Sequence, residues 1–252
     1  MFRSIKKTLG VGPGPKAETE LGAAPGETEL RNPVIEPWIV EIWQRVRPFT
    51  MTSESRLAAM CLAADYVTRK HLPGAIVECG VWRGGTMMAA ALTLMRADVS
   101  DRSLWLYDTF EGMTAPTGHD LDASGLGAAE QLARADRSTS HVWAYAAIDE
   151  VESNLASTGY ENLRLIKGDV LETLPAQAPA EIAILRLDTD WYESTRHELE
   201  CLFPRIVPGG VLIVDDYGHW QGSRKALDEY LLETARHLLV LPLDYTGVVA
   251  LV

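Results

Sequence analysis

Short apolar segments that alternate with helix-like segments constrain the fold of this chain more than any other feature of its sequence. Segments rich in Val, Ile and Leu occur at residues 75–80, 103–108, 162–169, 181–188 and 211–216, with polar or amphipathic stretches between them. This alternation predicts a parallel sheet that is covered by helices on both faces. Two more strands are expected at residues 238–243 and 248–252, and the short turn between them predicts that the last strand runs antiparallel to its neighbour. The predicted fold is therefore α/β and doubly wound, with a mostly parallel seven-stranded sheet.

The segments around these strands indicate how the chain is organised. Residues 1–37 combine prolines with Gly, Ala and Glu, which predicts a flexible arm before a single domain at residues 38–252. N-terminal helices are expected over residues 38–71, broken near Pro48, with Ser53 as a suitable N-cap for the second. A turn at residues 208–210 is expected to lead into the fifth strand, and residues 112–140 are expected to form a long polar loop.

Charge and cysteine content argue against several classes of function. Asp and Glu outnumber Lys and Arg by 35 to 23, for a formal net charge of −12, whereas nucleic-acid binding depends on concentrated basic residues. Cys61, Cys79 and Cys201 form no CxxC pair, so neither a zinc knuckle nor a disulfide framework is indicated. The sequence holds no apolar run of the roughly 18–20 residues that a membrane helix needs, and its start has no secretory h-region. We therefore expect a cytoplasmic protein with no nucleic-acid partner and no membrane insertion; a homo-oligomer is compatible with the sequence.

A glycine-rich turn follows the first expected strand. From Gly80 to Thr86 the sequence reads GVWRGGT, and such glycines let the backbone approach a ligand that faces the helix N–H groups. A dinucleotide fingerprint would need glycine at the position of Trp82, which disfavours a pyrophosphate and favours S-adenosylmethionine. Its carboxylate would accept from the helix N–H groups, and Glu78 at the strand end would face its ammonium group. A tight turn with no ligand is the alternative.

Acidic residues at the next two strand ends favour the adenosine ligand over an empty turn. Asp108, at the end of the second expected strand, is placed to accept from both ribose hydroxyls. Asp169, which follows Gly168 at the end of the third, is placed to accept from an adenine amino group. Three successive strand ends thus carry groups that suit S-adenosylmethionine.

Four aspartates follow the fourth and fifth expected strands. Residues two apart in a strand point to the same side, so Asp188 and Asp190 should project together, and a neighbouring strand would bring Asp215 and Asp216 to the same place. Crowded carboxylates repel unless a cation lies among them, and all-oxygen ligation suits Mg²⁺ or Mn²⁺ better than zinc. Helix capping is the alternative, and it accounts for one aspartate more readily than for four.

A cation at this place indicates a role for a neighbouring base. The cation would hold and acidify an acceptor hydroxyl, and the base would remove the proton as the oxygen attacks the methyl group in line. Asp190 is the first candidate for this base, because it lies near the expected metal without being needed as a ligand. His219 is the second candidate.

Four motifs resemble those of the macrocin O-methyltransferase (TylF-type) family. They are VECGVWRGGT at residues 77–86, YDTFEG at 107–112, LDTDWYEST at 187–195, and the stretch from PGG to DDYG at 208–218. The resemblance extends from about Thr50 to the C-terminus. It implies a Mg²⁺-dependent enzyme that methylates sugar hydroxyls, typically on deoxysugars of antibiotics.

The resemblance also implies roles for individual residues. It places metal ligands at Asp188, Asp215 and Asp216 and the base at Asp190. It places the methyl donor on residues of four segments: Met51, Ser53, Glu78, Gly80, Trp82, Arg83, Gly84, Gly85, Thr86, Asp108, Glu111, Gly168 and Asp169. The loop at residues 112–140 would be the lid over a sugar-containing acceptor.

Three other functions are compatible with parts of the pattern. A methyltransferase that acts on a catechol or another vicinal diol would use the same chemistry. A nicotinamide-dinucleotide oxidoreductase is disfavoured by Trp82. A non-catalytic binding module would have no need of both an adenosine site and four converging carboxylates.

Overall fold

The computed structural model describes residues 35–137 and 139–252, and residues 35–252 form one compact unit. Its core is a seven-stranded sheet in the order β3-β2-β1-β4-β5-β7-β6. The strands are β1 (Ala75–Cys79), β2 (Leu104–Asp108), β3 (Leu163–Lys167), β4 (Ile182–Leu187), β5 (Ile206–Val214), β6 (Leu241–Pro242) and β7 (Val248–Leu251). Neighbours from β3 to β5 pair in parallel, and β7 is antiparallel to both β5 and β6. The predicted fold class is confirmed.

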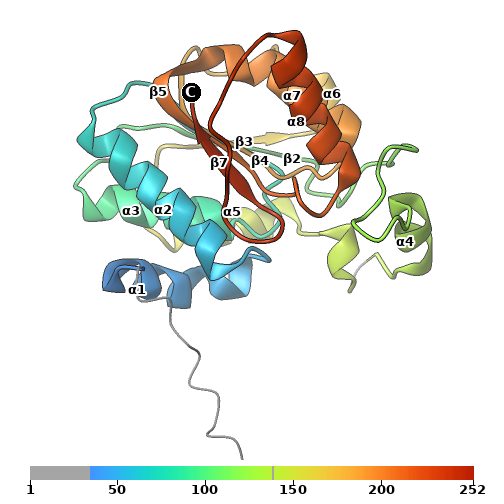
Figure 1. Cartoon of the computed structure of the whole chain (residues 1–252). Helices are drawn as coiled ribbons and strands as arrows, with labels where there is room; N and C mark the ends of the chain where they lie inside the picture. The colour runs from blue at the N-terminus through green and yellow to red at the C-terminus, as the bar shows by residue number, and fades with distance from the viewer. Residues whose placement is uncertain (1–34, 138) are drawn as a thin grey trace, which may run out of the picture. The chain divides into compact units, whose positions relative to one another are not determined.

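Helices cover both faces of this sheet (Figure 1). On one face lie α1 (Pro37–Val46), α2 (Glu54–Arg69), α3 (Gly85–Arg96) and α5 (Ile148–Ala156), and on the other α6 (Val170–Thr173), α7 (Tyr192–Leu202) and α8 (Gln221–Glu233). The loop after β2 contains α4 (Ala128–Arg134). The described residues also form three 3₁₀ helices: η1 (Arg47–Phe49), η2 (His141–Trp143) and η3 (Phe203–Arg205). No helix of the described residues is long and apolar enough to cross a membrane.

Alternation along the strands divides the apolar residues between two cores. In β1, Ile76 packs into the core with α1, α2, α3 and α5, whereas Val77 packs into the core with α7 and α8. In β5, Ile213 and Val214 are divided in the same way. Because both faces are buried, these strands read as continuous apolar runs in the sequence.

The beginning of the domain follows the expected pattern of two helices with a break. Pro48 lies in η1, which separates α1 from α2. Ser53 is the N-cap of α2, and its hydroxyl accepts a hydrogen bond from the N–H of Arg56 at 3.2 Å. Most of the predicted arm falls on residues 1–34, which lie outside the described residues, and Pro37 is already the first residue of α1.

Two predicted boundaries are wrong, and one predicted loop contains a helix. Residues 208–210 do not turn the chain into β5 but lie within it, because the strand takes up Gly209 (φ 82°) and Gly210 at a shift in its register with β4. The sixth strand pairs only over Leu241–Pro242 instead of residues 238–243. The loop at residues 112–140 is not wholly irregular, since it holds α4.

The order of the strands decides where a ligand can bind. The chain proceeds from β1 to β2 and β3 on one side and to β4 and β5 on the other. A crevice opens at the carboxyl ends of strands where the order reverses in this way. The polar residues singled out in the sequence follow β1 to β5 and therefore gather at this edge.

Candidate active site

A cavity of about 420 Å³ lies at the carboxyl ends of the parallel strands. Many of the predicted site residues line it: Met51, Gly80, Trp82, Thr86, Asp108, Gly168, Asp169, Asp188, Asp190, Asp215, Asp216 and His219. The loop after β2 closes part of the cavity with Met113, Thr114 and Gln131. Residues predicted to bind the methyl donor and residues predicted to bind a metal thus line the same cavity.

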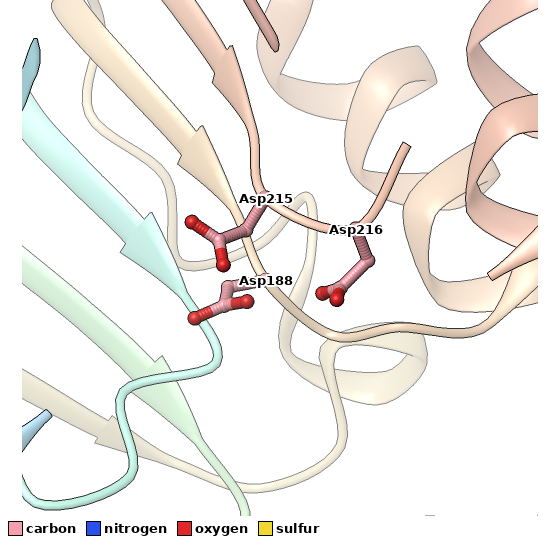
Figure 2. A group of neighbouring side chains, drawn as sticks. All are labelled: Asp188, Asp215 and Asp216. Carbon is pink, nitrogen blue, oxygen red and sulfur yellow. The ribbon is translucent and has the colours of Figure 1, made fainter. Parts of the chain in front are cut away.

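Three carboxylates converge on one side of the cavity. Oxygen atoms of Asp188, Asp215 and Asp216 all lie within 4.8 Å of one another. Figure 2 shows Asp188 just beyond one strand and Asp215 and Asp216 just beyond the next, with their carboxylates close together. The backbone N–H of Asp188 donates to Cys79 O at 2.8 Å, and that of Asp215 donates to Leu187 O at 2.9 Å. The sheet ladder therefore extends to two of the three residues and fixes their backbone.

The backbone conformation that places Asp190 at the cavity differs from the one predicted. β4 ends at Leu187, so the two-residue alternation of a strand does not relate Asp188 to Asp190. Asp190 instead adopts a left-handed backbone conformation (φ 67°), which is uncommon for a residue other than glycine. The indole N–H of Trp220 donates to its Oδ2 at 3.0 Å. Asp188 and Asp190 thus line the same cavity, but the strand argument that related their side chains is wrong.

The surroundings favour protonation of several of these carboxyl groups. Removal from bulk water raises the pKa of Asp190 to about 7, and the charges of Asp188 and Asp215 add to this effect. Burial raises the pKa of Asp216 well above its usual range, and Asp190 and Asp215 reinforce the shift. Positive charge placed among these groups would therefore stabilise their ionised forms.

Arg186 lies at the centre of the carboxylates and is itself buried. Its Nη1 donates to Glu78 Oε1 at 2.5 Å and to Asp188 Oδ2 at 2.7 Å, and its Nη2 donates to Asp215 Oδ1 at 2.5 Å. Arg56, from α2, contacts Asp215 Oδ2 and donates from Nε to Asp244 at 2.9 Å. Both guanidinium groups orient acidic side chains at the edge of the cavity.

The residues present fit a hard divalent cation. Asp188, Asp215 and Asp216 offer only oxygen, which is the ligand type that Mg²⁺ and Mn²⁺ prefer. Asp216 Oδ2 is buried and has no hydrogen-bond partner among the described residues. A buried carboxylate oxygen without a partner is costly, and ligation to a cation would satisfy it.

The glycine turn after β1 is shaped by two close contacts. Gly80 has φ 81°, and a Cβ there would lie 2.0 Å from Asp188 O, so only glycine fits between the ends of β1 and β4. Asp108 holds the turn from β2, because its Oδ2 accepts from the N–H groups of Val81 at 2.7 Å and Trp82 at 3.0 Å. Asp108 therefore orders the turn and faces the cavity as well.

Asp169, at the end of β3, also both stabilises the local backbone and lines the cavity. Its Oδ1 accepts from the N–H of Leu171 at 2.9 Å and caps the short helix α6. With Gly168 it also lines the cavity. Both aspartates that the sequence predicts to bind adenosine thus line the cavity.

The structure places six predicted donor residues outside the cavity lining. Glu78 is buried against Arg186, and its Oε2 has no hydrogen-bond partner among the described residues. Ser53 caps α2 and donates to Asp244 at 2.6 Å. Arg83 pairs with Glu150 at 2.5 Å and donates to Pro48 O, so it ties the turn to α5 and η1.

The remaining residues outside the lining are two glycines and a surface acid. Gly84 has φ 87° and is the N-cap of α3, and a Cβ on Gly85 would lie 2.5 Å from Phe49 O, so both permit close packing at the beginning of α3. Glu111 is exposed and pairs with Lys167 at 2.8 Å.

Sequence reasoning missed three residues of the site. Arg186 could have been identified from the sequence, because an arginine inside an otherwise apolar strand predicts buried acidic partners. Trp220 follows His219 in the sequence, and their rings meet edge to face with centroids 4.9 Å apart. Its place in the site is shown by the hydrogen bond from its indole to Asp190, which the sequence pattern does not indicate. Arg56 lies in α2, and nothing in its local sequence connects it with Asp215.

The strand order, the antiparallel β7 and a cavity at the strand ends define the fold of S-adenosylmethionine-dependent methyltransferases. The sequence model described as Macrocin-O-methyltransferase (TylF) matches residues 41–250. The chain belongs to this family and is an O-methyltransferase.

Similar proteins of known activity agree with this assignment. Demethyldecarbamoylnovobiocin O-methyltransferase of Streptomyces niveus is 33% identical over 185 residues, which cover 72% of this chain and 67% of that protein. A protein of Streptomyces olivaceus, 8-demethyl-8-(2,3-dimethoxy-alpha-L-rhamnosyl)-tetracenomycin-C 4'-O-methyltransferase, is 34% identical over 184 residues, which cover 72% of this chain and 67% of that protein. The solved structure of the O-methyltransferase NovP is 32% identical, with a TM-score of 0.70 and 81% of each chain covered.

Proposed function

We propose that this protein transfers a methyl group from S-adenosylmethionine to a hydroxyl group of a sugar, with the help of a divalent cation, Mg²⁺ or Mn²⁺. One observation carries the proposal above all others. The acidic cluster and the donor-side turn of a methyltransferase fold line the same cavity. A hydroxyl held at the cluster would therefore lie beside a donor held at the turn.

The donor would lie along the ends of β1, β2 and β3. The turn at Gly80 allows close approach of its amino-acid portion, and the N-terminus of α3 favours its carboxylate. Asp108 and Asp169 supply acceptors for the ribose hydroxyls and the adenine amino group. Glu78 lies behind the turn with Arg186, so its charge would act on the donor's ammonium group through the wall of the cavity.

Asp188, Asp215 and Asp216 would hold the cation. When bound, the cation would lower the pKa of an acceptor hydroxyl and fix its position. Arg186, which also lines the cavity, donates hydrogen bonds to Asp188 and Asp215 and so fixes the orientation of their carboxylates. Such support of ligating carboxylates by hydrogen bonds is a usual requirement of metal sites.

Asp190 would take the proton. The acceptor oxygen forms a bond to the methyl carbon as the bond from that carbon to sulfur breaks, which leaves neutral S-adenosylhomocysteine. The hydroxyl proton passes to the carboxylate of Asp190, which Trp220 holds in place. Burial and the charges of Asp188 and Asp215 raise the pKa of Asp190. A cation bound beside it would lower that pKa, so the carboxylate would be ionised and able to take a proton near neutral pH. His219 also lines the cavity and is the alternative base.

The nature of the acceptor is inferred from the relatives. The S. olivaceus protein is named for methylation of a rhamnosyl group on tetracenomycin, and a third relative, from Micromonospora griseorubida, is a mycinamicin III 3''-O-methyltransferase. We infer a glycosylated natural product, a glycan or a nucleotide sugar as acceptor, with the loop at residues 112–140 as its lid. Met113, Thr114 and Gln131 face the cavity from this loop.

Two measurements test the proposal. Isothermal titration should show binding of S-adenosylhomocysteine and no binding of NAD. Incubation with S-adenosylmethionine, Mg²⁺ and a panel of glycosides and nucleotide sugars should then give products heavier by one methylene group, detected by mass spectrometry. Methylation of catechols and of no sugar in the panel would contradict the sugar assignment, and binding of NAD alone would contradict the donor.

A further inference from the structure

A buried aspartate in the loop after β2 makes contacts for which the proposed chemistry gives no reason. Asp120 is fully buried, with 0% of its surface exposed. Its Oδ1 accepts from the N–H of Tyr192 at 2.7 Å, and its Oδ2 accepts from the N–H of Thr117 at 2.6 Å and from the Thr117 hydroxyl at 2.9 Å. One carboxylate thus joins its own loop to the first residue of α7.

Helix α7 takes its N-terminal cap from this loop. Its N-cap residue, Trp191, makes no side-chain capping bond. Asp120 supplies the missing acceptor from 72 residues earlier in the chain. A carboxylate at a helix N-terminus satisfies a free N–H group and interacts favourably with the helix dipole.

Helix α8 leaves space for the same carboxylate. Gly222 lies in its first turn, and a Cβ at this position would lie 2.0 Å from Asp120 Oδ1. The neighbouring Gln221 donates from its backbone to Leu121 O and from its side chain to Asp122 O, both at 2.9 Å. Residues 120–122 are therefore fastened to the beginnings of both α7 and α8.

These two helix beginnings carry the groups that surround Asp190. Trp191 follows Asp190 directly and donates from its indole to Thr114 O of the loop at 3.1 Å. Trp220 precedes α8 and donates to Asp190 Oδ2. The rings of Trp191 and Trp220 meet edge to face, with their centroids 5.0 Å apart. The fastened loop, the two tryptophans and Asp190 thus form one connected set.

We propose that Asp120 is a positioning residue that latches the loop after β2 onto the helices that follow β4 and β5, and thereby fixes the carboxylate of Asp190 relative to the acceptor. This inference rests on the proposed function, since it takes Asp190 as the base. Asp120 does not line the cavity and would act through Trp191 and Trp220. The donor side is formed by residues directly at the ends of β1, β2 and β3, such as Gly80, Asp108 and Asp169, which precede or lie outside the segment that Asp120 holds. Loss of the latch should therefore leave donor binding intact.

A double-mutant cycle tests the latch from both sides. Asp120→Ala removes the carboxylate, and Gly222→Ala places a methyl group against it. Each single change should lower kcat/KM for the acceptor by about 10- to 100-fold, because a displacement of about 1 Å can have an effect of this size. Gly222→Ala should have a smaller effect in the Asp120→Ala background, because its methyl group then meets no carboxylate and keeps only the contact with the backbone N of Tyr192 at 3.0 Å.

Donor affinity separates positioning from a general loss of structure. The Kd for S-adenosylhomocysteine should stay at the wild-type value in each variant, whereas a merely structural role predicts weaker donor binding and additive effects on kcat/KM. Asp65→Asn, a change of an aspartate that pairs within α2 with the exposed Arg69, is the control for the change in charge. If Asp120→Ala does not fold, Thr117→Val removes one of the three hydrogen bonds and should give a smaller effect of the same kind.

Hydrogen exchange gives a readout that does not depend on turnover. Peptides within residues 112–134 should exchange faster in Asp120→Ala than in the wild type, with S-adenosylhomocysteine bound to both full-length proteins. Wild-type exchange in this segment together with wild-type kcat/KM would overturn the latch. Full turnover in Asp190→Asn would instead overturn the proposed base, and faster exchange in Asp120→Ala would still show the fastening of the loop.

Discussion

Replacement of Arg186 by methionine removes the guanidinium that contacts Glu78, Asp188 and Asp215. Asp215 keeps its contact with Arg56, and Asp188 is partly open to the cavity, with 28% of its side chain exposed. Glu78 is only 1% exposed, and no other ion pair to it occurs in the part of the chain that the structure describes. The variant therefore leaves about one buried carboxylate without compensation.

The expected loss of stability follows from the one buried carboxylate, that of Glu78, which loses its ion-pair partner. Removal of one partner of a buried ion pair costs about 3–5 kcal/mol, because the remaining charge is buried alone. For a domain of this size each kcal/mol lowers Tm by about 2–4 °C, so Arg186→Met should melt about 6–20 °C below the wild type near pH 8. Chemical denaturation and thermal melting, both in the presence of a chelator, measure the effect.

The loss should depend on pH in a defined direction. Burial raises the pKa of Glu78 to about 7, against the opposing charge of Arg186. A carboxyl group whose pKa is higher in the folded than in the unfolded state favours folding at low pH and opposes it as pH rises. Without Arg186 the pKa of Glu78 rises further, so the destabilisation should be largest near pH 8 and smaller near pH 5.

A surface arginine provides the control. Arg69→Met breaks an ion pair with Asp65 in which the arginine side chain is 73% exposed, and it should cost less than about 1 kcal/mol. A stability of Arg186→Met equal to that of the wild type near pH 8, or a loss that does not shrink near pH 5, would refute this account of the buried cluster.

Three further variants test single residues. Asp190→Asn should keep the wild-type Kd for S-adenosylhomocysteine and lose about 10²- to 10⁴-fold in turnover, because the amide cannot take the hydroxyl proton; retained turnover would leave His219 as the base. Ser53→Ala should lower the free energy of unfolding by about 1 kcal/mol through loss of the α2 cap; a large loss of donor affinity would instead support the donor contact that the family resemblance implies. Glu111→Gln removes an exposed pair with Lys167 and should leave both stability and donor affinity unchanged, so weaker donor binding would show that Glu111 reaches the ligand.

The sequence was sufficient to predict the sheet and the place of the site. β1, β4 and β5 are buried on both faces, so their apolar runs identify them, and carboxyl-terminal ends of parallel strands meet at one edge. This reasoning predicts that Asp188 and Asp215 lie together, and their carboxylate oxygens do converge.

Contacts that depend on register and tertiary packing could not be predicted. Glu78 was expected to face the donor, but Arg186 lies opposite it in the paired strand β4 and takes its carboxylate. The left-handed conformation of Asp190 and its hydrogen bond with Trp220 arise from a loop whose course the sequence pattern does not encode. For the same reason nothing near Asp120 indicated that it caps a helix 72 residues later.

The most direct test of the central claim is the rate of methyl transfer to a sugar acceptor after complete chelation of divalent cations and during readdition of Mg²⁺. The account predicts that turnover stops on chelation and returns with Mg²⁺, and that Asp216→Asn needs a much higher Mg²⁺ concentration for the same rate, since it lacks one of the three converging carboxylates. Full turnover in the presence of the chelator would contradict the claim that Asp188, Asp215 and Asp216 work by holding a cation.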